Sequence, residues 1–88
     1  MVEITAAIVK MAESTCMVVI VKRDVIENDL LALEAFRVFS QFFPLMPVVL
    51  MAQNFKGDGI YRGPEDLVKL LDKVKPEEMS WKTYHVSK

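Results

Sequence analysis

The sequence predicts an α/β fold: a small mixed sheet of three or four strands, built from a βαβ unit and a β-hairpin and flanked by helices. Two continuous apolar runs, residues 16–21 and 47–52, have the length and composition of strands covered on both faces. A long apolar-rich segment, residues 25–43, separates them, and a glycine turn at residues 56–59 follows. Two strands joined through a helix should be parallel, with a right-handed crossover.

The first element is expected to be a helix over residues 2–13. Alanines favour a helix here, and Ile4, Ile8 and Met11 recur at helical spacing. A strand over residues 3–9 is the alternative.

The segment between the two apolar runs predicts one long helix over residues 25–43. Asp24 precedes it as a candidate N-cap, and Glu27 lies at capping-box spacing from Asp24. Pro44 should end the helix, because proline disfavours helical conformation in the residue before it.

The C-terminal half predicts a hairpin and a second long helix. The turn at residues 56–59 and the segment 60–62 indicate a hairpin with a short third strand. Pro64 suits the first position of the last helix, and Pro76 should end it. Residues 76–88 are expected to form an extended tail or an edge strand.

The 88 residues are enough for one domain over residues 1–88. A chain this short buries only about 60–65% of the surface that its unfolded form exposes, so additional stabilisation is expected. Cys16 is the only cysteine, which excludes an intrachain disulfide, and a single histidine, His85, argues against structural zinc. A partner chain remains, so we expect a homo-oligomer or a protein partner, and no cofactor.

Charge and hydropathy exclude two classes of partner. The net charge is −1 and both signs are mixed along the chain, whereas a nucleic-acid-binding surface needs excess positive charge. The longest apolar stretches, residues 16–21 and 42–52, are shorter than the roughly 20 residues of a membrane span. No basic region precedes an apolar run near residue 1, so we expect no secretory signal and a cytoplasmic location.

The predicted helix over residues 25–43 carries more apolar surface than one sheet can bury. With residues about 100° apart, its apolar face spans roughly twice the stripe that a helix on a sheet requires. The excess face consists of Leu31, Ala35, Val38 and Phe42. Either the first helix or the C-terminal tail covers this face, or a second copy of the chain does, and the short chain favours the second copy.

Polar side chains follow the two predicted parallel strands at the edge where ligands bind in open α/β sheets. They are Lys22, Arg23, Asp24, Gln53 and Asn54. Two cations and two amides around a helix N-terminus could hold a small anion or form an enzymatic site. In the simpler interpretation, Asp24 only caps the helix and the other four are solvated strand-end and turn residues.

Three aromatic residues, Trp81, Tyr84 and Tyr61, could form a contact surface, or could pack the tail onto its own domain. Cys16 is expected to be a core residue, because only His85 could activate it as a nucleophile. No catalytic constellation, phosphate-binding loop or metal site is apparent. The sequence therefore favours a non-enzymatic module that self-associates or docks on a protein partner.

The C-terminal half resembles glutaredoxins and other thioredoxin-like proteins. Residues 46–50, Met-Pro-Val-Val-Leu, and residues 60–67, Ile-Tyr-Arg-Gly-Pro-Glu-Asp-Leu, carry the likeness, and residues 18–22 resemble the opening glutaredoxin strand with its lysine. The resemblance spans about half the chain. The family's Cys-x-x-Cys would fall at residues 24–27, where the sequence has Asp-Val-Ile-Glu, and the chain has no room for the family's further strand–helix step.

The resemblance implies a second function, a non-redox thioredoxin-like domain that binds a small thiol or peptide near Pro47. Pro47 would match the family's cis-proline. The positions that cradle glutathione would be Lys22, Gly63, Glu65 and Asp66. Without the two cysteines, thiol–disulfide chemistry by the family's route is excluded.

Overall fold

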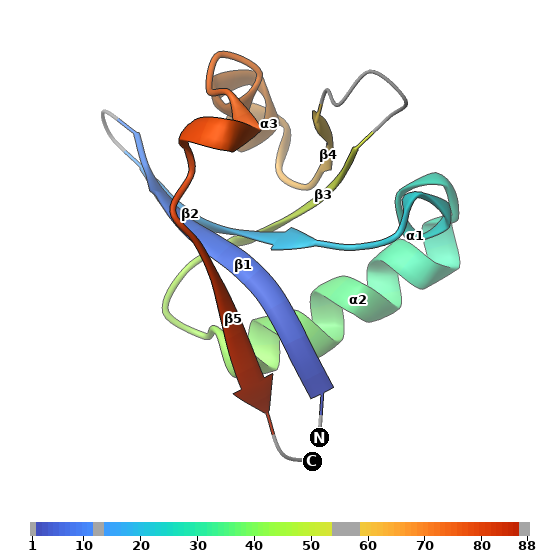
Figure 1. The fold of residues 1–88 in the computed structure, drawn as a ribbon. Helices are drawn as coiled ribbons and strands as arrows, with labels where there is room; N and C mark the ends of the chain where they lie inside the picture. Colours follow the sequence, from blue (N-terminus) through green and yellow to red (C-terminus); the bar gives the residue numbers. More distant parts are fainter. Residues whose placement is uncertain (1, 12–13, 54–58, 87–88) are drawn as a thin grey trace.

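A computed structural model describes residues 2–11, 14–53 and 59–86 of the chain. Five strands form one mixed sheet in the order β4-β3-β2-β1-β5 (Figure 1). Their bounds are Val2–Lys10 for β1, Thr15–Ile20 for β2, Val48–Gln53 for β3, Gly59–Arg62 for β4 and Trp81–Val86 for β5.

Helices cover both faces of the sheet. Helices α1 (Arg23–Glu27) and α2 (Asp29–Phe42) lie on one face, and α3 (Glu65–Leu71) with the short 3₁₀ helix η1 (Pro76–Glu78) lies on the other (Figure 1). Strands β2 and β3 are parallel and β4 is antiparallel to β3, as the βαβ unit and the hairpin require. The predicted α/β class is confirmed, although the sheet has five strands rather than three or four.

The helix predicted for residues 2–13 was wrong, because β1 occupies this segment. Strand β1 pairs antiparallel with β2 on one side and with β5 on the other, so hydrogen bonding to two neighbours outweighs the helix propensity of its alanines. Its side chains alternate between two covered faces. Ile4 and Ala6 are buried under α2, and Ala7 and Val9 are buried on the α3 side.

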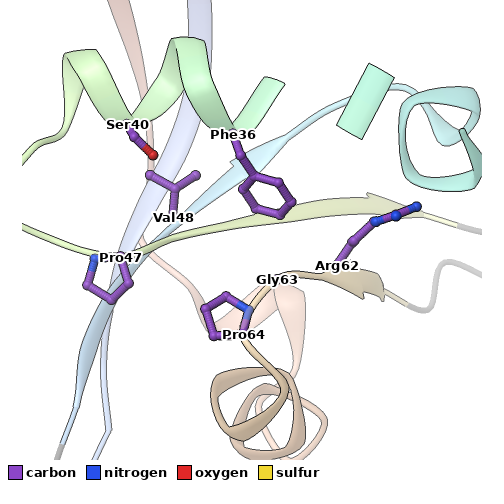
Figure 2. A pocket seen from close by; sticks show the side chains of 7 residues that line it. All are labelled: Phe36, Ser40, Pro47, Val48, Arg62, Gly63 and Pro64. Carbon is purple, nitrogen blue, oxygen red and sulfur yellow. The ribbon is translucent and has the colours of Figure 1, made fainter. Parts of the chain in front are cut away.

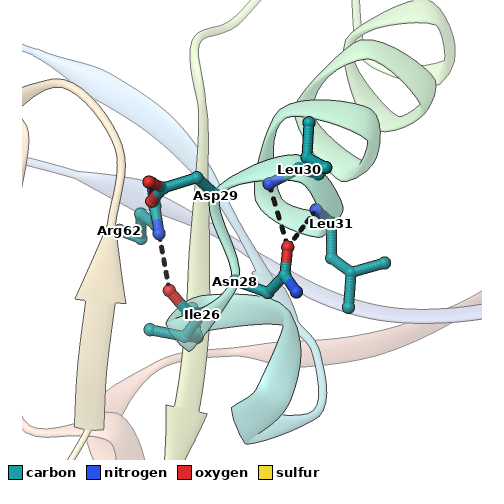
Figure 3. A network of polar contacts seen from close by, with 6 residues as sticks. All are labelled: Ile26, Asn28, Asp29, Leu30, Leu31 and Arg62. Carbon is teal, nitrogen blue, oxygen red and sulfur yellow. Dashed lines mark hydrogen bonds and ion pairs between the residues drawn. The ribbon is translucent and has the colours of Figure 1, made fainter.

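The single helix predicted for residues 25–43 is broken at Asn28. The extended backbone of Asn28 ends α1, and its Oδ1 accepts hydrogen bonds from the backbone N–H groups of Leu30 (3.0 Å) and Leu31 (3.1 Å) at the start of α2 (Figure 3). Lys22, not Asp24, is the N-cap of α1, and Asp24 lies in the first turn. Asparagine is a preferred N-cap residue, so Asn28 itself was a local signal in the sequence that a new helix begins there.

Two apolar layers lie on the two faces of the sheet. Residues 16–19 and 48–52 are buried without interruption, which confirms that both central strands are covered on both faces. Phe36 and Phe39 of α2 pack on one side, and Leu67 and Leu71 of α3 pack on the other. No helix in the described part of the chain is long and apolar enough to cross a membrane.

The C-terminal segment forms an edge strand, β5. Its two aromatic residues point to opposite faces of the sheet. Tyr84 contacts the ring of Phe43 edge to face, with centroids 5.4 Å apart, at the end of α2. Trp81 packs in the α3 layer, and its Nε1–H donates a hydrogen bond to the carbonyl oxygen of Pro76 at 2.8 Å, which ties β5 to η1.

Candidate functional site

An apolar groove of about 410 Å³ lies at the N-terminal end of β3, between α2 and the turn that joins β4 to α3. Figure 2 shows the side chains of α2 on one side of the groove and two proline rings across from them. The groove is lined by Phe36, Ser40, Pro47, Val48, Arg62, Gly63 and Pro64.

Local structure explains why these residues meet. Phe36 and Ser40 are four positions apart, so both lie on the same flank of α2. Pro47 directly precedes β3, where its missing N–H costs no hydrogen bond in the sheet interior. At Gly63, a Cβ would lie 3.3 Å from Cγ2 of Val49, so glycine lets the β4–α3 turn approach β3 closely.

The chemistry of the groove is that of an apolar binding surface. Its polar groups are the exposed hydroxyl of Ser40 and the guanidinium of Arg62. Arg62 is already engaged, because its Nη1 donates to the carbonyl oxygen of Ile26 at 2.7 Å and its Nη2 donates to the carboxylate of Asp29 (Figure 3). Arg62 thus ties β4 to the α1–α2 junction, and the groove suits an apolar group better than an anion.

Three exposed leucines lie within six residues, along the chain, of residues that line the groove, and we call them the leucine rim: Leu30, Leu33 and Leu45. Their exposed fractions are 78%, 68% and 93%. Leu33 lies three residues before Phe36, so it extends the groove flank of α2 by one turn, and Leu30 lies one turn further. Leu45 is two residues before the groove residue Pro47 in the chain. Exposed apolar side chains of this kind usually mark an interface where they lie together on the surface.

The interface residues predicted on the long helix occupy the opposite flank of α2. Ala35 and Phe42 are half-buried and pack against the sheet, while Leu31 is exposed and Val38 half-buried. All four residues belong to α2, and the packing of Ala35 and Phe42 against the sheet leaves less apolar surface exposed on this flank than the sequence predicted.

The candidate residues at the strand ends lie at the other end of β3, about 16 Å along the strand from the groove. Lys22, Arg23 and Asp24 are exposed at the start of α1, and the Nε–H of Arg23 donates to Oε1 of Glu27 at 2.7 Å. Gln53 is exposed at the end of β3. Asn54 lies outside the described residues, and an anion site at these strand ends stays a prediction.

The residues implied by the thioredoxin-like resemblance divide between the two ends of β3. Pro47 and Gly63 both line the groove. Glu65 and Asp66 are exposed in the first turn of α3, directly after the groove residue Pro64. Lys22 lies at the far end, before α1. The resemblance thus named two of the groove residues. Sequence reasoning missed the other lining residues, Phe36, Ser40, Val48, Arg62 and Pro64, for which the i,i+4 spacing of Phe36 and Ser40 was the only local signal.

The remaining reactive side chains take no part in this site. Cys16 is fully buried in β2, and burial raises the pKa of its thiol, which keeps it protonated and unreactive. His85 lies on β5, where its Nδ1 is 3.6 Å from Oε1 of Glu3. Among the described residues, no three histidine, cysteine or acidic side chains gather where they could hold a metal ion.

Comparison with known proteins adds no assignment. The chain matches no protein-family model, no curated protein and no solved structure. The groove and the surfaces around it are therefore the basis for a function.

Proposed function

We propose that this chain is a small, non-enzymatic interaction module that associates with a second copy of itself through the groove and the leucine rim. The observation that carries the proposal is that Leu45, the most exposed large apolar residue in the described part of the chain, is two residues before Pro47, which lines the apolar groove.

A two-fold dimer needs one patch that is complementary to itself. Leu45 is exposed and lies only two residues before Pro47, which lines the groove, so the proposal places the Leu45 side chain beside the groove. A two-fold axis between them lets Leu45 of each copy enter the groove of the other. The leucines of α2 then cover the edges of the contact, and each leucine that becomes fully buried contributes about 1.5–3 kcal/mol.

Replacing Leu33 or Leu45 with glutamate should weaken self-association. In sedimentation equilibrium at high micromolar concentration, we expect the wild-type chain to exceed the monomer mass. Leu33→Glu and Leu45→Glu should each lower the average mass, because a carboxylate must lose its hydration to enter the apolar contact. Both positions are exposed, so circular dichroism should show an unchanged fold.

Val38→Glu is the matched control, because Val38 lies on the opposite flank of α2. It should leave the average mass unchanged. Dissociation by Val38→Glu but not by Leu33→Glu would place the interface on the flank predicted from sequence and contradict the groove proposal. A wild-type chain that stays monomeric at high micromolar concentration would contradict self-association altogether.

As a second candidate, we propose a non-redox thioredoxin-like domain that binds a small thiol or peptide in the same groove. The observation that favours it is that Pro47 and Gly63, two positions implied by the resemblance, both line the groove. Titration of ¹⁵N-labelled protein with millimolar glutathione should shift the backbone amide signals of Phe36, Val48 and Gly63.

S-methylglutathione separates thiol from peptide recognition, because it keeps the peptide and blocks the sulfur. Equal shifts with both ligands indicate peptide binding, and smaller shifts with the methylated ligand indicate a contact to the thiol. Shifts confined to the α3 side of the sheet, or no shifts at millimolar glutathione, would exclude this candidate.

A further inference from the structure

The outer edge of β5 is a second surface on which the chain can make contacts. In the part of the chain that the structure describes, β5 pairs only with β1 and is the last strand of the sheet (Figure 1). One row of its backbone N–H and C=O groups therefore points away from the sheet. Such a row is a template for pairing with another strand.

We infer that this edge pairs antiparallel with the same edge of a second copy, about a two-fold axis at Thr83, so that two sheets join into one. The inference goes beyond the groove proposal, because β5 does not line the groove and is the edge strand opposite β4, which carries Arg62 of the groove.

The side chains of β5 select this register. With the two-fold axis perpendicular to the sheet, each face of one sheet continues into the same face of the partner's sheet. Two residues directly opposite each other across the contact therefore have side chains on the same face. With Thr83 opposite the partner's Thr83, Trp81 lies opposite the partner's His85 and Lys82 opposite the partner's Tyr84. Threonine pairs and aromatic pairs are favourable across antiparallel strands.

The neighbouring registers are less favourable. An axis at Lys82 sets two lysines directly opposite each other, and like charges in that position destabilise a strand pair. An axis at Tyr84 leaves Trp81 outside the pairing. A lysine on an edge strand often blocks pairing, but in the Thr83 register each lysine meets a tyrosine ring, along which its aliphatic stem can lie.

Charge exchange at residue 83 tests both the pairing and its register. Thr83→Lys should raise the dissociation constant of the β5 contact roughly five-fold, because the two introduced lysines face each other. Thr83→Glu should weaken the contact similarly. An equimolar mixture of the two variants should restore association as a heterodimer, since residue 83 then pairs lysine with glutamate.

These measurements are made in the Leu45→Glu background, which separates the β5 contact from the groove contact. Thr15→Glu is the matched control for Thr83→Glu, since Thr15 is an exposed strand threonine that pairs with Lys10, beyond the part of β1 that pairs with β5, and a glutamate opposite Lys10 creates no like-charge pair. It should leave association unchanged. An unchanged mass for Thr83→Lys, or weakened association that the mixture does not restore, would overturn the inference.

A covalent probe gives an independent test. A short bismaleimide should cross-link Thr83→Cys into dimers and leave Thr15→Cys monomeric, while the native Cys16 is buried and does not compete. Absence of a cross-linked Thr83→Cys dimer would also overturn the inference, whatever the groove variants show. Recovery of a different protein cross-linked through residue 83, with no homodimer, would show that the edge serves another partner.

Discussion

Replacing Leu50 with alanine should lower the free energy of unfolding by about 2–5 kcal/mol. Leu50 is fully buried in β3, between β2 and β4, and its side chain packs in the layer under α2. The substitution removes apolar atoms that no neighbour can replace without moving a strand, so a cavity remains. Urea denaturation followed by circular dichroism measures the change.

Leu70→Ala removes the same atoms at an exposed position on α3 and is the matched control. We expect a change within about 0.5 kcal/mol for it, as for most surface substitutions. A Leu50→Ala variant that is no less stable than Leu70→Ala would show that β3 is not at the centre of the fold.

Alkaline pH should destabilise the protein, because two acidic groups, the thiol of Cys16 and the hydroxyl of Tyr61, are buried in the folded chain. Burial raises the pKa of the Cys16 thiol above its ordinary value of 9.0. Burial, the carboxylate of Asp72 and the thiolate form of Cys16 raise the pKa of Tyr61 above its ordinary value of 10.0. The unfolded chain releases these protons first and the folded chain retains them, so the free energy of unfolding decreases as pH rises.

The loss should begin near the ordinary thiol pKa of 9.0 and continue until the folded groups titrate. Its slope is at most about 1.4 kcal/mol per pH unit for each group. Urea denaturation at neutral pH and at increasing alkaline pH measures it. Cys16→Ala and Tyr61→Phe should each reduce the slope.

Tyr61→Phe should cost little at neutral pH, because the buried hydroxyl of Tyr61 has no hydrogen-bond partner among the described residues. This separates the effect of ionisation from general damage to the core. An unchanged alkaline slope in the double variant Cys16→Ala/Tyr61→Phe would show that other groups control the pH dependence.

Predictions from the sequence succeeded where the residues adjacent in the chain are enough to determine whether a segment is buried or exposed. The apolar runs at residues 16–21 and 47–52 contain no polar side chain, so each had to be covered on both faces and the segment between them had to cross over the sheet. The glycine turn before residue 60 likewise predicted the β3–β4 hairpin.

Predictions failed where a local preference competed with a distant partner. Residues 2–10 carry alanines at helix-compatible spacing, but strands from residues 15–20 and 81–86 bond to both of their edges. Asn28 is the N-cap of α2, but the apolar residues before and after it continue one helical periodicity, so the sequence predicted a single helix across it. The side chain of Arg62, from a strand 33 residues further along than Asp29, holds the resulting junction.

The sequence by itself determined the α/β class, the parallel pair of central strands and the excess of apolar surface on the helical segment, because hydrophobic patterning is a local property of the chain. Only the tertiary structure decided where that excess lies and which residues form the groove. Phe36, Pro47 and Gly63 come from three different elements, and no spacing in the sequence determines how closely a helix, a strand and a turn approach each other. That distance depends on side-chain packing across the whole layer under α2.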